Sequence, residues 1–357
     1  MASELFFDLY AIERMTEFRL KNLLERFRTP EGIFGANHKE LVAVAGVNEE
    51  LARAIVSYQR SPATAALIEK AKGLGVQVVS YLDDAFPANL KGVAHMPPVL
   101  FIRGEIKESD SIAVAVVGTR RPSHYGAQMA EKLGRELGAA GITVVSGLAR
   151  GVDTLAHRGA LAAGGRTIAV LGCGIDVYYP PENRQLCEAI VQAGAVLSEY
   201  PLGMEPLAMN FPKRNRVISA LSKVVVAVEA GERSGVLNTC AWAKEQGREV
   251  FAVPGRVGEE RSVGTNRLIR DGAKILTATE DVLERLGIKT AIMPRKEVAL
   301  ADAERLVLEV IKAEPVHIDE ICESLGMPMA ELLNLLFQLE IKEMVKQLPG
   351  KFFVRAG

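Results

Sequence analysis

Between residues 112 and 277, short runs of apolar, β-branched residues alternate with amphipathic segments of helical period. Three of the runs are IAVAVVG (112–118), ITVVSG (142–147) and KVVVAVEA (223–230). Strands that are apolar on both faces need helices on both faces, and this requirement favours a parallel sheet. The alternation therefore predicts an α/β fold whose core is a doubly wound, extended Rossmann-like sheet. Such sheets bind ligands at the carboxyl ends of their strands, beside helix N-termini.

The chain has 357 residues, which is too long for one compact domain. In the first of its predicted units, a helix, a turn at Gly46 and a second helix resemble a helix-hairpin-helix or a sterile-alpha-motif unit. Residues 76–105 add two short strands that extend the sheet. In the last unit, three helices precede a hairpin that turns at Pro349, which is the outline of a winged helix. The predicted division is a small all-α domain at 1–75, the Rossmann-like core at 76–286, a linker at 287–300 and a winged-helix-like domain at 301–357.

The composition excludes several classes of protein. No run of about 18 apolar residues exists, and the N-terminus lacks the basic and long apolar regions of a secretion signal. We therefore expect no membrane span and a cytoplasmic protein. Cysteines that are far apart and form no C-x-x-C pair predict reduced, mostly buried thiols, and they are Cys173, Cys187, Cys240 and Cys322. With five scattered histidines, the sequence predicts no metal site.

Three cations, Lys213, Arg214 and Arg216, lie within four positions ahead of the valine-rich run. The net charge of the chain is −1, so this cluster is a local site rather than part of a generally basic surface. Phe211 stands beside it, and a stacking ring next to phosphate-seeking cations is typical of single-stranded nucleic-acid binding. The alternative is a basic helix face that contacts only water.

The turn after the first run, VVGTRRPSHYG, lacks the G-x-G-x-x-G pattern of dinucleotide sites, and the second run ends in Ser-Gly rather than in an acid. A nicotinamide cofactor is therefore disfavoured. Gly118 lets a backbone approach a ligand closely, and the planar guanidinium of Arg120 suits phosphate oxygens. The alternative for Arg120 is a pair with a carboxylate. In a third turn, Tyr178 or Tyr179 either stacks on a base or packs against its own loop.

Ser146, Asp153 and His157 suggest a hydrolytic triad, but the pattern favours a structural role. Asp153 and His157 are four positions apart on one helix, and Ser146 lacks the G-x-S-x-G nucleophile elbow. A capped helix with a packing histidine is the better interpretation.

Ser234 and Gly235 open a helix after the valine-rich run, and the free N–H groups there can form an anion cradle. In hydrolases of related design, a glutamate on this helix performs the chemistry. Residues 233–244 contain neither Asp nor Glu. The cradle is therefore predicted without a catalyst.

Taken together, the turns resemble those of the DNA-processing protein A (DprA/Smf) family. VVGTRRPSHYG, SGLARGVDTLAHRGAL, AVLGCGIDVYYPPEN, NFPKRNRVISALS and VEAGERSGVLNT occur in the family's order, within a match that covers most of residues 78–277. The resemblance implies a non-catalytic protein of the bacterial cytoplasm, without a cofactor, that binds single-stranded DNA. It also implies that the protein protects incoming strands during natural transformation and helps to load the RecA recombinase onto them.

The same resemblance implies which residues contact DNA: Gly118, Thr119, Arg120, Ser146, Gly147, Phe211, Lys213, Arg214, Asn215 and Arg216. It also implies a homodimer that forms through the late part of the core. Leu268, Ile269 and Leu276 are the predicted interface, and ordinary packing within the chain is the alternative. Asn238 stands where the family commonly has an aliphatic residue, which leaves the inner packing of its helix open.

Two other functions remain open. One is a nucleotide-processing hydrolase on the same sheet, like the phosphoribohydrolase relatives of this fold. The other is sequence-specific regulation through the C-terminal unit. Its candidate recognition helix at 328–344 is rich in Leu and Glu and short of Arg, whereas base-reading helices expose Arg, Asn or Gln. We expect this unit to contact protein or to act as a cap.

Overall fold

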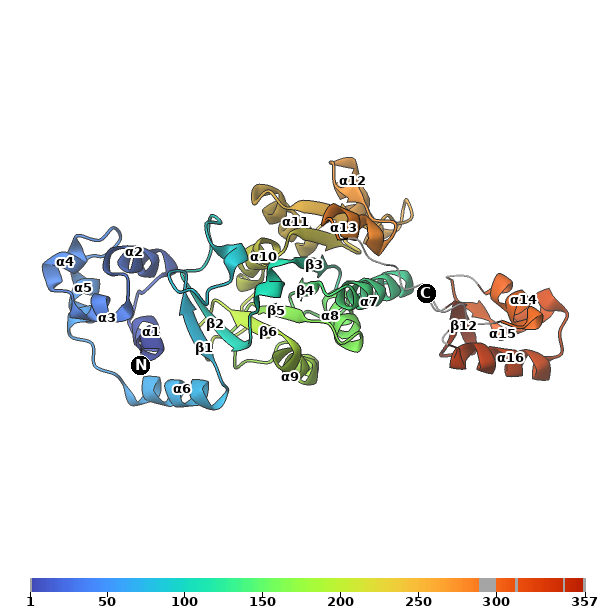
Figure 1. Ribbon diagram of the computed structural model, residues 1–357, viewed down its shortest axis with the longest axis horizontal. Helices are drawn as coiled ribbons and strands as arrows, with labels where there is room; N and C mark the ends of the chain where they lie inside the picture. The colour runs from blue at the N-terminus through green and yellow to red at the C-terminus, as the bar shows by residue number, and fades with distance from the viewer. Residues whose placement is uncertain (1, 289–299, 312–313, 343, 356–357) are drawn as a thin grey trace.

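The computed structural model describes residues 2–288, 300–311, 314–342 and 344–355. In this part of the chain, nine strands form one sheet in the order β1-β2-β6-β5-β4-β3-β7-β8-β9 (Figure 1). All neighbours from β6 to β9 in this order are parallel, whereas β1 and β2 are antiparallel additions at the β6 edge. The strands are β1 (Gln77–Ser80), β2 (Val99–Gly104), β3 (Ala113–Val117), β4 (Thr143–Ser146), β5 (Thr167–Leu171), β6 (Ala195–Ser198), β7 (Val224–Ala227), β8 (Glu249–Ala252) and β9 (Lys274–Ile275). The predicted doubly wound sheet is confirmed, and so is its extension by two strands.

Helices cover both faces of the sheet, because the strands direct apolar side chains alternately into two cores. Ala115 of β3 lies in the core that also holds residues of α10 and α11, and Val116 lies in the core that holds residues of α7 and α8. The helices of this region are α7 (His124–Ala139), α8 (Val152–Ala162), α9 (Arg184–Ala193), α10 (Asn210–Leu221), α11 (Gly235–Glu245), α12 (Val263–Arg270) and α13 (Thr279–Arg285).

The chain winds in two directions from β3. Through α7, α8 and α9 it leads away to β4, β5 and β6, and through α10 it returns to β7, which pairs with the other side of β3. The loops that leave the carboxyl ends of β3 and β7 therefore run to opposite halves of the sheet. Their divergence leaves room for a ligand at this point.

The N-terminal helices share a core with the sheet. They are α1 (Ala2–Ala11), α2 (Glu17–Phe27), α3 (Pro30–Gly35), α4 (His38–Val42), α5 (Glu49–Val56) and α6 (Pro62–Gly73). The rings of Phe7 and Tyr10 each lie 5.6 Å from the ring of Phe101 on β2. The domain boundary at residue 75 stays a prediction, since one apolar cluster extends across it.

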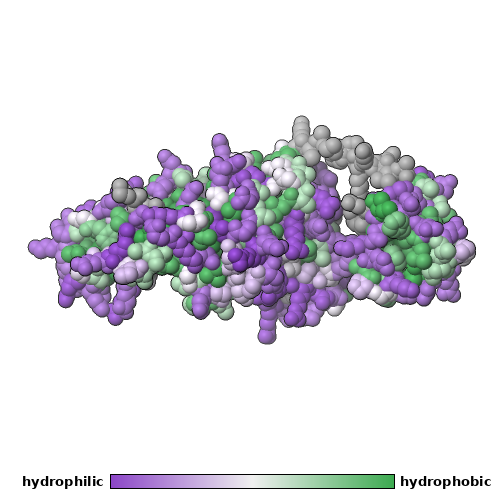
Figure 2. Space-filling model, turned by 90° about the horizontal axis from the view of Figure 1, so that it is seen from below, coloured by the Kyte–Doolittle hydropathy of each residue, from purple (hydrophilic) through white to green (hydrophobic). Residues whose placement is uncertain are grey.

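The C-terminal unit has an apolar core of its own. It is built from α14 (Asp302–Val310), β10 (Val316–His317), α15 (Ile318–Leu325), α16 (Met329–Ile341), β11 (Val345–Leu348) and β12 (Phe352–Arg355), with the strands in the order β10-β12-β11. These are the three helices and the hairpin that the sequence predicted. Figure 2 shows apolar side chains gathered on this unit, and α16 exposes Met329, Leu333, Phe337 and Ile341. Residues 289–299 of the predicted linker lie outside the described residues.

Among the described residues, no helix is both long and apolar enough to cross a membrane. The four cysteines are free thiols, and all except the half-buried Cys322 are buried. Burial raises the pKa of Cys187 to about 11 and the pKa of Cys240 to about 12. These thiols therefore stay protonated at neutral pH. The prediction of unpaired, mostly buried cysteines is confirmed.

Candidate nucleic-acid interface

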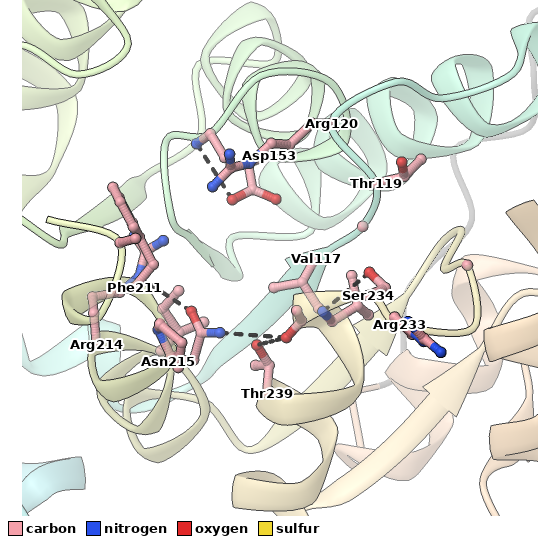
Figure 3. A pocket seen from close by; sticks show the side chains of 18 of the residues that line it. Val117, Thr119, Arg120, Asp153, Phe211, Arg214, Asn215, Arg233, Ser234 and Thr239 are labelled. Carbon is pink, nitrogen blue, oxygen red and sulfur yellow. Dashed lines mark hydrogen bonds between the residues drawn. The ribbon is translucent and has the colours of Figure 1, made fainter. Parts of the chain in front are cut away.

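An open cavity of about 890 Å³ lies at the carboxyl ends of β3 and β7 (Figure 3). The segments that line it include the turn after β3, the first turns of α10, and the loop that enters α11. The cavity lies at the divergence of the two halves of the sheet, where the fold predicts a ligand. The predicted residues in its lining are Gly118, Thr119, Arg120, Phe211, Arg214, Asn215, Ser234 and Gly235.

Phe211 is the centre of an aromatic and cationic cluster on one side of the cavity. The guanidinium carbons of Arg120 and Arg214 lie 5.6 Å and 5.9 Å from the centre of its ring, and the ring of Tyr179 lies 5.5 Å away. Arg120 is exposed, and no carboxylate in the described chain pairs with it. Its guanidinium is therefore available to an anion beside two half-buried aromatic rings.

Arg214 lies below this ring and is fixed by the backbone. Its buried Nη1 donates to the carbonyl oxygen of Gly147 at 2.8 Å and to that of Val170. A Cβ on Gly147 would lie 2.6 Å from the guanidinium, so only glycine leaves the space that Arg214 occupies. Burial lowers the pKa of Arg214, and the charge of Asp153 opposes this effect. Arg214 thus holds a positive charge in place at the bottom of the site.

The opposite side of the cavity holds Ser234 and Gly235, the residues of the predicted anion cradle (Figure 3). Ser234 is the N-cap of α11, and its Oγ accepts from the amide of Val236 at 3.3 Å. Asn215 of α10 donates from Nδ2 to the carbonyl oxygen of Gly235 at 3.4 Å and to Oδ1 of Asn238 at 3.3 Å. Asn238 therefore links two walls of the site, which explains a polar residue at a position where an aliphatic one was expected.

Two small residues of the turns have roles in the packing of the sheet, and only one of them, Gly118, also lines the cavity. A Cβ on Gly118 would lie 2.5 Å from the side chain of Val152, so the glycine lets the turn after β3 pack against the start of α8. Ser146 is fully buried, and its hydroxyl donates to the carbonyl oxygen of Val116 at 2.7 Å. The prediction that Ser146 contacts DNA is therefore wrong, because its side chain points into the sheet.

Asp153 and His157 have structural roles, as predicted, but Asp153 fixes a turn instead of capping α8, whose N-cap is Gly151 and has no side-chain cap. The carboxylate of Asp153 accepts from the amides of Gly147 and Ala149, at 3.1 Å and 3.4 Å, and so fixes the turn after β4. His157 is fully buried, and its Nδ1 lies 2.6 Å from Oγ1 of Thr167. The hydroxyl of Ser146 donates to a backbone carbonyl, and Nδ1 of His157 lies against Thr167 rather than against Ser146, so the three residues do not form the relay of a nucleophilic site.

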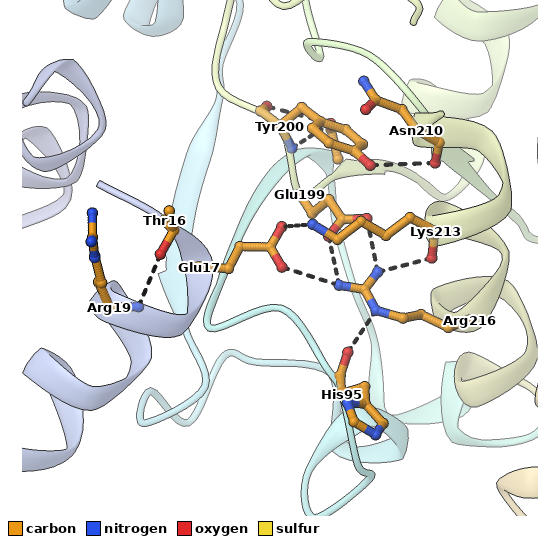
Figure 4. A network of polar contacts seen from close by, with 10 residues as sticks. Thr16, Glu17, Arg19, His95, Glu199, Tyr200, Asn210, Lys213 and Arg216 are labelled. Carbon is orange, nitrogen blue, oxygen red and sulfur yellow. Dashed lines mark hydrogen bonds and ion pairs between the residues drawn. The ribbon is translucent and has the colours of Figure 1, made fainter. Parts of the chain in front are cut away.

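The other two cations of the predicted cluster do not face the cavity (Figure 4). Arg216 is buried, and its guanidinium donates two hydrogen bonds to Glu199, at 2.8 Å and 2.7 Å. Nζ of Lys213 lies 2.6 Å from Oε1 of Glu17 on α2. The prediction of a single basic patch is wrong, and so is the placement of Arg216 against DNA, because its charge is already paired inside the protein. The assignment of Lys213 stays a prediction.

Helix geometry explains this division. Successive side chains on a helix point about 100° apart, so neighbouring cations of α10 face different surroundings. Arg214 points toward the sheet and the cavity, whereas Arg216 points toward the loop after β6. The sequence contained an indication that Arg216 has an internal partner, because Glu199 directly follows a strand that ends at the same edge of the sheet.

The predicted dimer interface is partly intrachain core. Leu276 is 1 % exposed and packs in the core beneath α7 and α13, so its assignment to an interface is wrong and the alternative holds. Leu268 and Ile269 are half-buried and pack against the opposite core. For these two residues the interface stays a prediction.

Sequence reasoning missed other residues of the lining. Glu232, Arg233, Glu260 and Val263 lie there: the first two precede α11 within a quoted motif but were not assigned to the site, and the last two begin the helical turns at 260 and 263. Tyr178 and Tyr179 have separate roles, since the hydroxyl of Tyr178 donates to Glu188 at 2.7 Å and only Tyr179 lines the cavity.

Comparison with known proteins agrees with this geometry. Residues 77–287 match the family model described as DNA recombination-mediator protein A, and residues 291–351 match the one described as DprA winged helix domain. Protein Smf of Escherichia coli is 39% identical over 279 residues, which are 75% of this chain and 74% of that protein. DNA processing protein DprA of Streptococcus pneumoniae is 46% identical over 204 residues, which are 57% of this chain and 72% of that protein.

Two solved structures are similar as well. The X-ray structure of DprA from Streptococcus pneumoniae has a TM-score of 0.70 and 35% identity, and the match covers 80% of this chain and 98% of that one. DNA processing protein A from Helicobacter pylori, described for its single-stranded DNA binding mode, has a TM-score of 0.54 and 33% identity, over 59% of this chain and 95% of that one. With its sheet, its glycine-rich turns and its C-terminal winged helix, this chain belongs to the DprA/Smf family of DNA-processing proteins.

Proposed function

We propose that the protein binds single-stranded DNA in the cavity at the ends of β3 and β7. The observation that carries this proposal is the exposed, unpaired Arg120 beside the rings of Phe211 and Tyr179. Aromatic faces stack on bases of any sequence, and an adjacent guanidinium binds the phosphate oxygens of the same strand. The Helicobacter pylori relative, described for its single-stranded DNA binding mode, supports the same class of ligand.

The two sides of the cavity have different parts in this function. Bases stack on Phe211 and Tyr179, and a phosphate binds Arg120. A second phosphate binds the first backbone N–H of α11, because the N-cap Ser234 already accepts from the next two amides. Arg214 adds a fixed positive potential from below. Binding of this kind needs no nucleophile and no general base, so we infer that the protein acts without catalysis.

We further propose that the bound strand is incoming DNA during natural transformation, and that the protein protects it and helps to load the RecA recombinase as a homodimer. Membership of the DprA/Smf family supports this role. A strand-exchange assay with purified recombinase tests it. We expect the protein to shorten the lag of recombinase filament formation on strands that are covered by a single-strand-binding protein, and an unchanged lag contradicts the loading role.

Replacing Arg120 by alanine is expected to weaken binding of an oligothymidine strand roughly eightfold at 50 mM salt. The variant loses one phosphate contact, so the slope of log affinity against log salt falls by about 0.7. A fluorescence-anisotropy titration at several salt concentrations measures both quantities. Arg121→Ala is the matched control, because Arg121 is an exposed neighbour outside the cavity lining. If Arg120→Ala and Arg121→Ala bind alike, the site is misplaced.

One observation favours the hydrolase alternative: the carboxylate-bearing residues Glu232 and Glu260 line the same cavity as the N-terminus of α11. A nucleotide-processing enzyme needs an acid near a bound phosphate. Incubation of the pure protein with nucleoside monophosphates, followed by chromatography of the free base, decides between the two. We expect no release above the rate of a Glu232→Gln variant, and a Glu232-dependent release of base would contradict the non-catalytic proposal.

A further inference from the structure

Four charged side chains join α2 of the N-terminal region to α10, the helix that carries Phe211 and Arg214 (Figure 4). Nζ of Lys213 lies 2.6 Å from Oε1 of Glu17 and 3.9 Å from Oε2 of Glu199. Oε2 of Glu17 also lies 3.5 Å from Nη2 of Arg216. Two anions therefore face two cations, and the cluster as a whole is neutral.

The two pairs in this cluster differ in how easily they separate. The side chains of Arg216 and Glu199 are 4 % and 1 % exposed and share two short hydrogen bonds, so separating them would leave a buried, unpaired charge. The side chains of Lys213 and Glu17 are 45 % and 27 % exposed. Water reaches this second pair, and pairs of such exposure contribute little net stability. Lys213 is thus the one cation of the cluster that can exchange its partner.

Glu17 is held in an unfavourable position for a carboxylate. Burial and the nearby charge of Glu199 raise its pKa, and its hydrogen bond with Lys213 opposes this effect. Lys213 stands on the first turn of α10, directly before Arg214 and two positions after Phe211. A phosphate of a strand that stacks on Phe211 has the same anionic oxygens as Glu17 and approaches Lys213 from the solvent side.

We propose that Glu17 competes with DNA phosphate for Lys213, so that the N-terminal helix α2 limits the affinity of the interface for single-stranded DNA. This inference rests on the proposed function. When a phosphate takes the place of the carboxylate, Glu17 returns to water and Lys213 becomes an additional contact. Because coupling between two binding events is reciprocal, any partner that draws α2 away from α10 strengthens strand binding, and a bound strand loosens α2.

The Glu17→Gln variant tests the competition. Glutamine keeps the shape of the side chain and removes its charge, so Lys213 is free to bind phosphate. We expect the affinity for an oligothymidine strand to rise by up to about eightfold at 50 mM salt, and the log–log salt slope to steepen by about 0.7. Glu25→Gln is the matched control on the same helix, where Glu25 pairs with Lys21 and has no contact with Lys213. It should bind as the wild type does.

A double-variant cycle shows whether the gain passes through Lys213. Lys213→Gln alone should change the affinity little, because its charge is already paired in the wild type. In the Glu17→Gln background the same replacement should abolish the gain. An equal gain with and without Lys213, or no gain at all, overturns the inference.

The Arg120→Ala variant, measured in the same series, separates this inference from the proposed function. If Arg120→Ala weakens binding while Glu17→Gln leaves it unchanged, the competition is wrong and the interface stands. If neither replacement changes the affinity, the interface itself is misplaced. Thermal unfolding of Glu17→Gln, followed by circular dichroism, checks that α2 remains folded. The Glu17→Asp variant retains the charge, so it should bind the strand as weakly as the wild type does.

Discussion

Replacing Arg214 by alanine is expected to lower the free energy of unfolding by about 3–5 kcal/mol. The guanidinium donates to the carbonyl oxygens of Gly147 and Val170, and both acceptors lose their partner when it is removed. Burial raises the pKa of the buried Asp153, and the charge of Arg214 opposes this rise. Without Arg214, this carboxyl group has no compensating cation beside it. The replacement therefore damages the support of the site as well as its charge.

Urea denaturation followed by circular dichroism measures this loss as a shift of the unfolding midpoint. Arg120→Ala is the matched control, because it removes the same side chain from the same cavity at an exposed position. Its stability should stay within about 0.5 kcal/mol of the wild type. If the two variants unfold at equal urea concentrations, Arg214 is not the buried support described above.

The stability of the protein is expected to fall with pH below about 6.5 because of His157. Burial and, to a smaller extent, the charge of Arg214 lower the pKa of this imidazole from 6.5 to about 3. Between these two values the unfolded chain binds a proton that the folded chain does not. The stabilisation of the folded protein by neutral His157 is therefore complete above pH 6.5. It is lost as the pH falls toward 3, by about 1.4 kcal/mol of unfolding free energy for each pH unit.

The difference in urea midpoints between the wild type and His157→Gln from pH 7.5 to 5.5 isolates this effect, because the other groups of shifted pKa, such as Glu17 and His124, are the same in both proteins. His157→Gln should flatten the dependence. His95→Gln is the control, since the side chain of His95 is exposed. An equal pH dependence in His157→Gln and the wild type would show that His157 is not kept neutral by burial.

The fold was predictable because the sequence patterns that determine each strand and helix lie within that element. The runs around Ala115 and Val225 are apolar on both faces, and the helices between them have one apolar side, so the parallel sheet and its two cores were predictable. The turn after β3 was equally accessible, since Thr119 and Arg120 stand directly at the end of a strand. For these residues, position along the chain determines position in space.

The errors concern pairs that are far apart in the sequence. Glu17 is 196 positions from Lys213, and nothing near either residue indicates that they meet. Arg216 seemed free for the same reason, although Glu199 is its partner. Ser146 was misassigned because its side chain points inward, whereas the carbonyl oxygen of the next residue, Gly147, accepts from Arg214 of the site. Charge patterns predict where cations stand, and only the fold determines which of them stay available.

The packing of the rings of Phe7 and Tyr10 against Phe101 bears on how the N-terminal helices should be studied. A shortened protein that begins at residue 76 would uncover an aromatic ring and the apolar flank of β2 to water. Exposed surface of this kind promotes self-association. Weak DNA binding by such a fragment would then result from aggregation rather than from lost DNA contacts. Single replacements on α2 avoid this problem, because they leave the apolar flank of β2 covered.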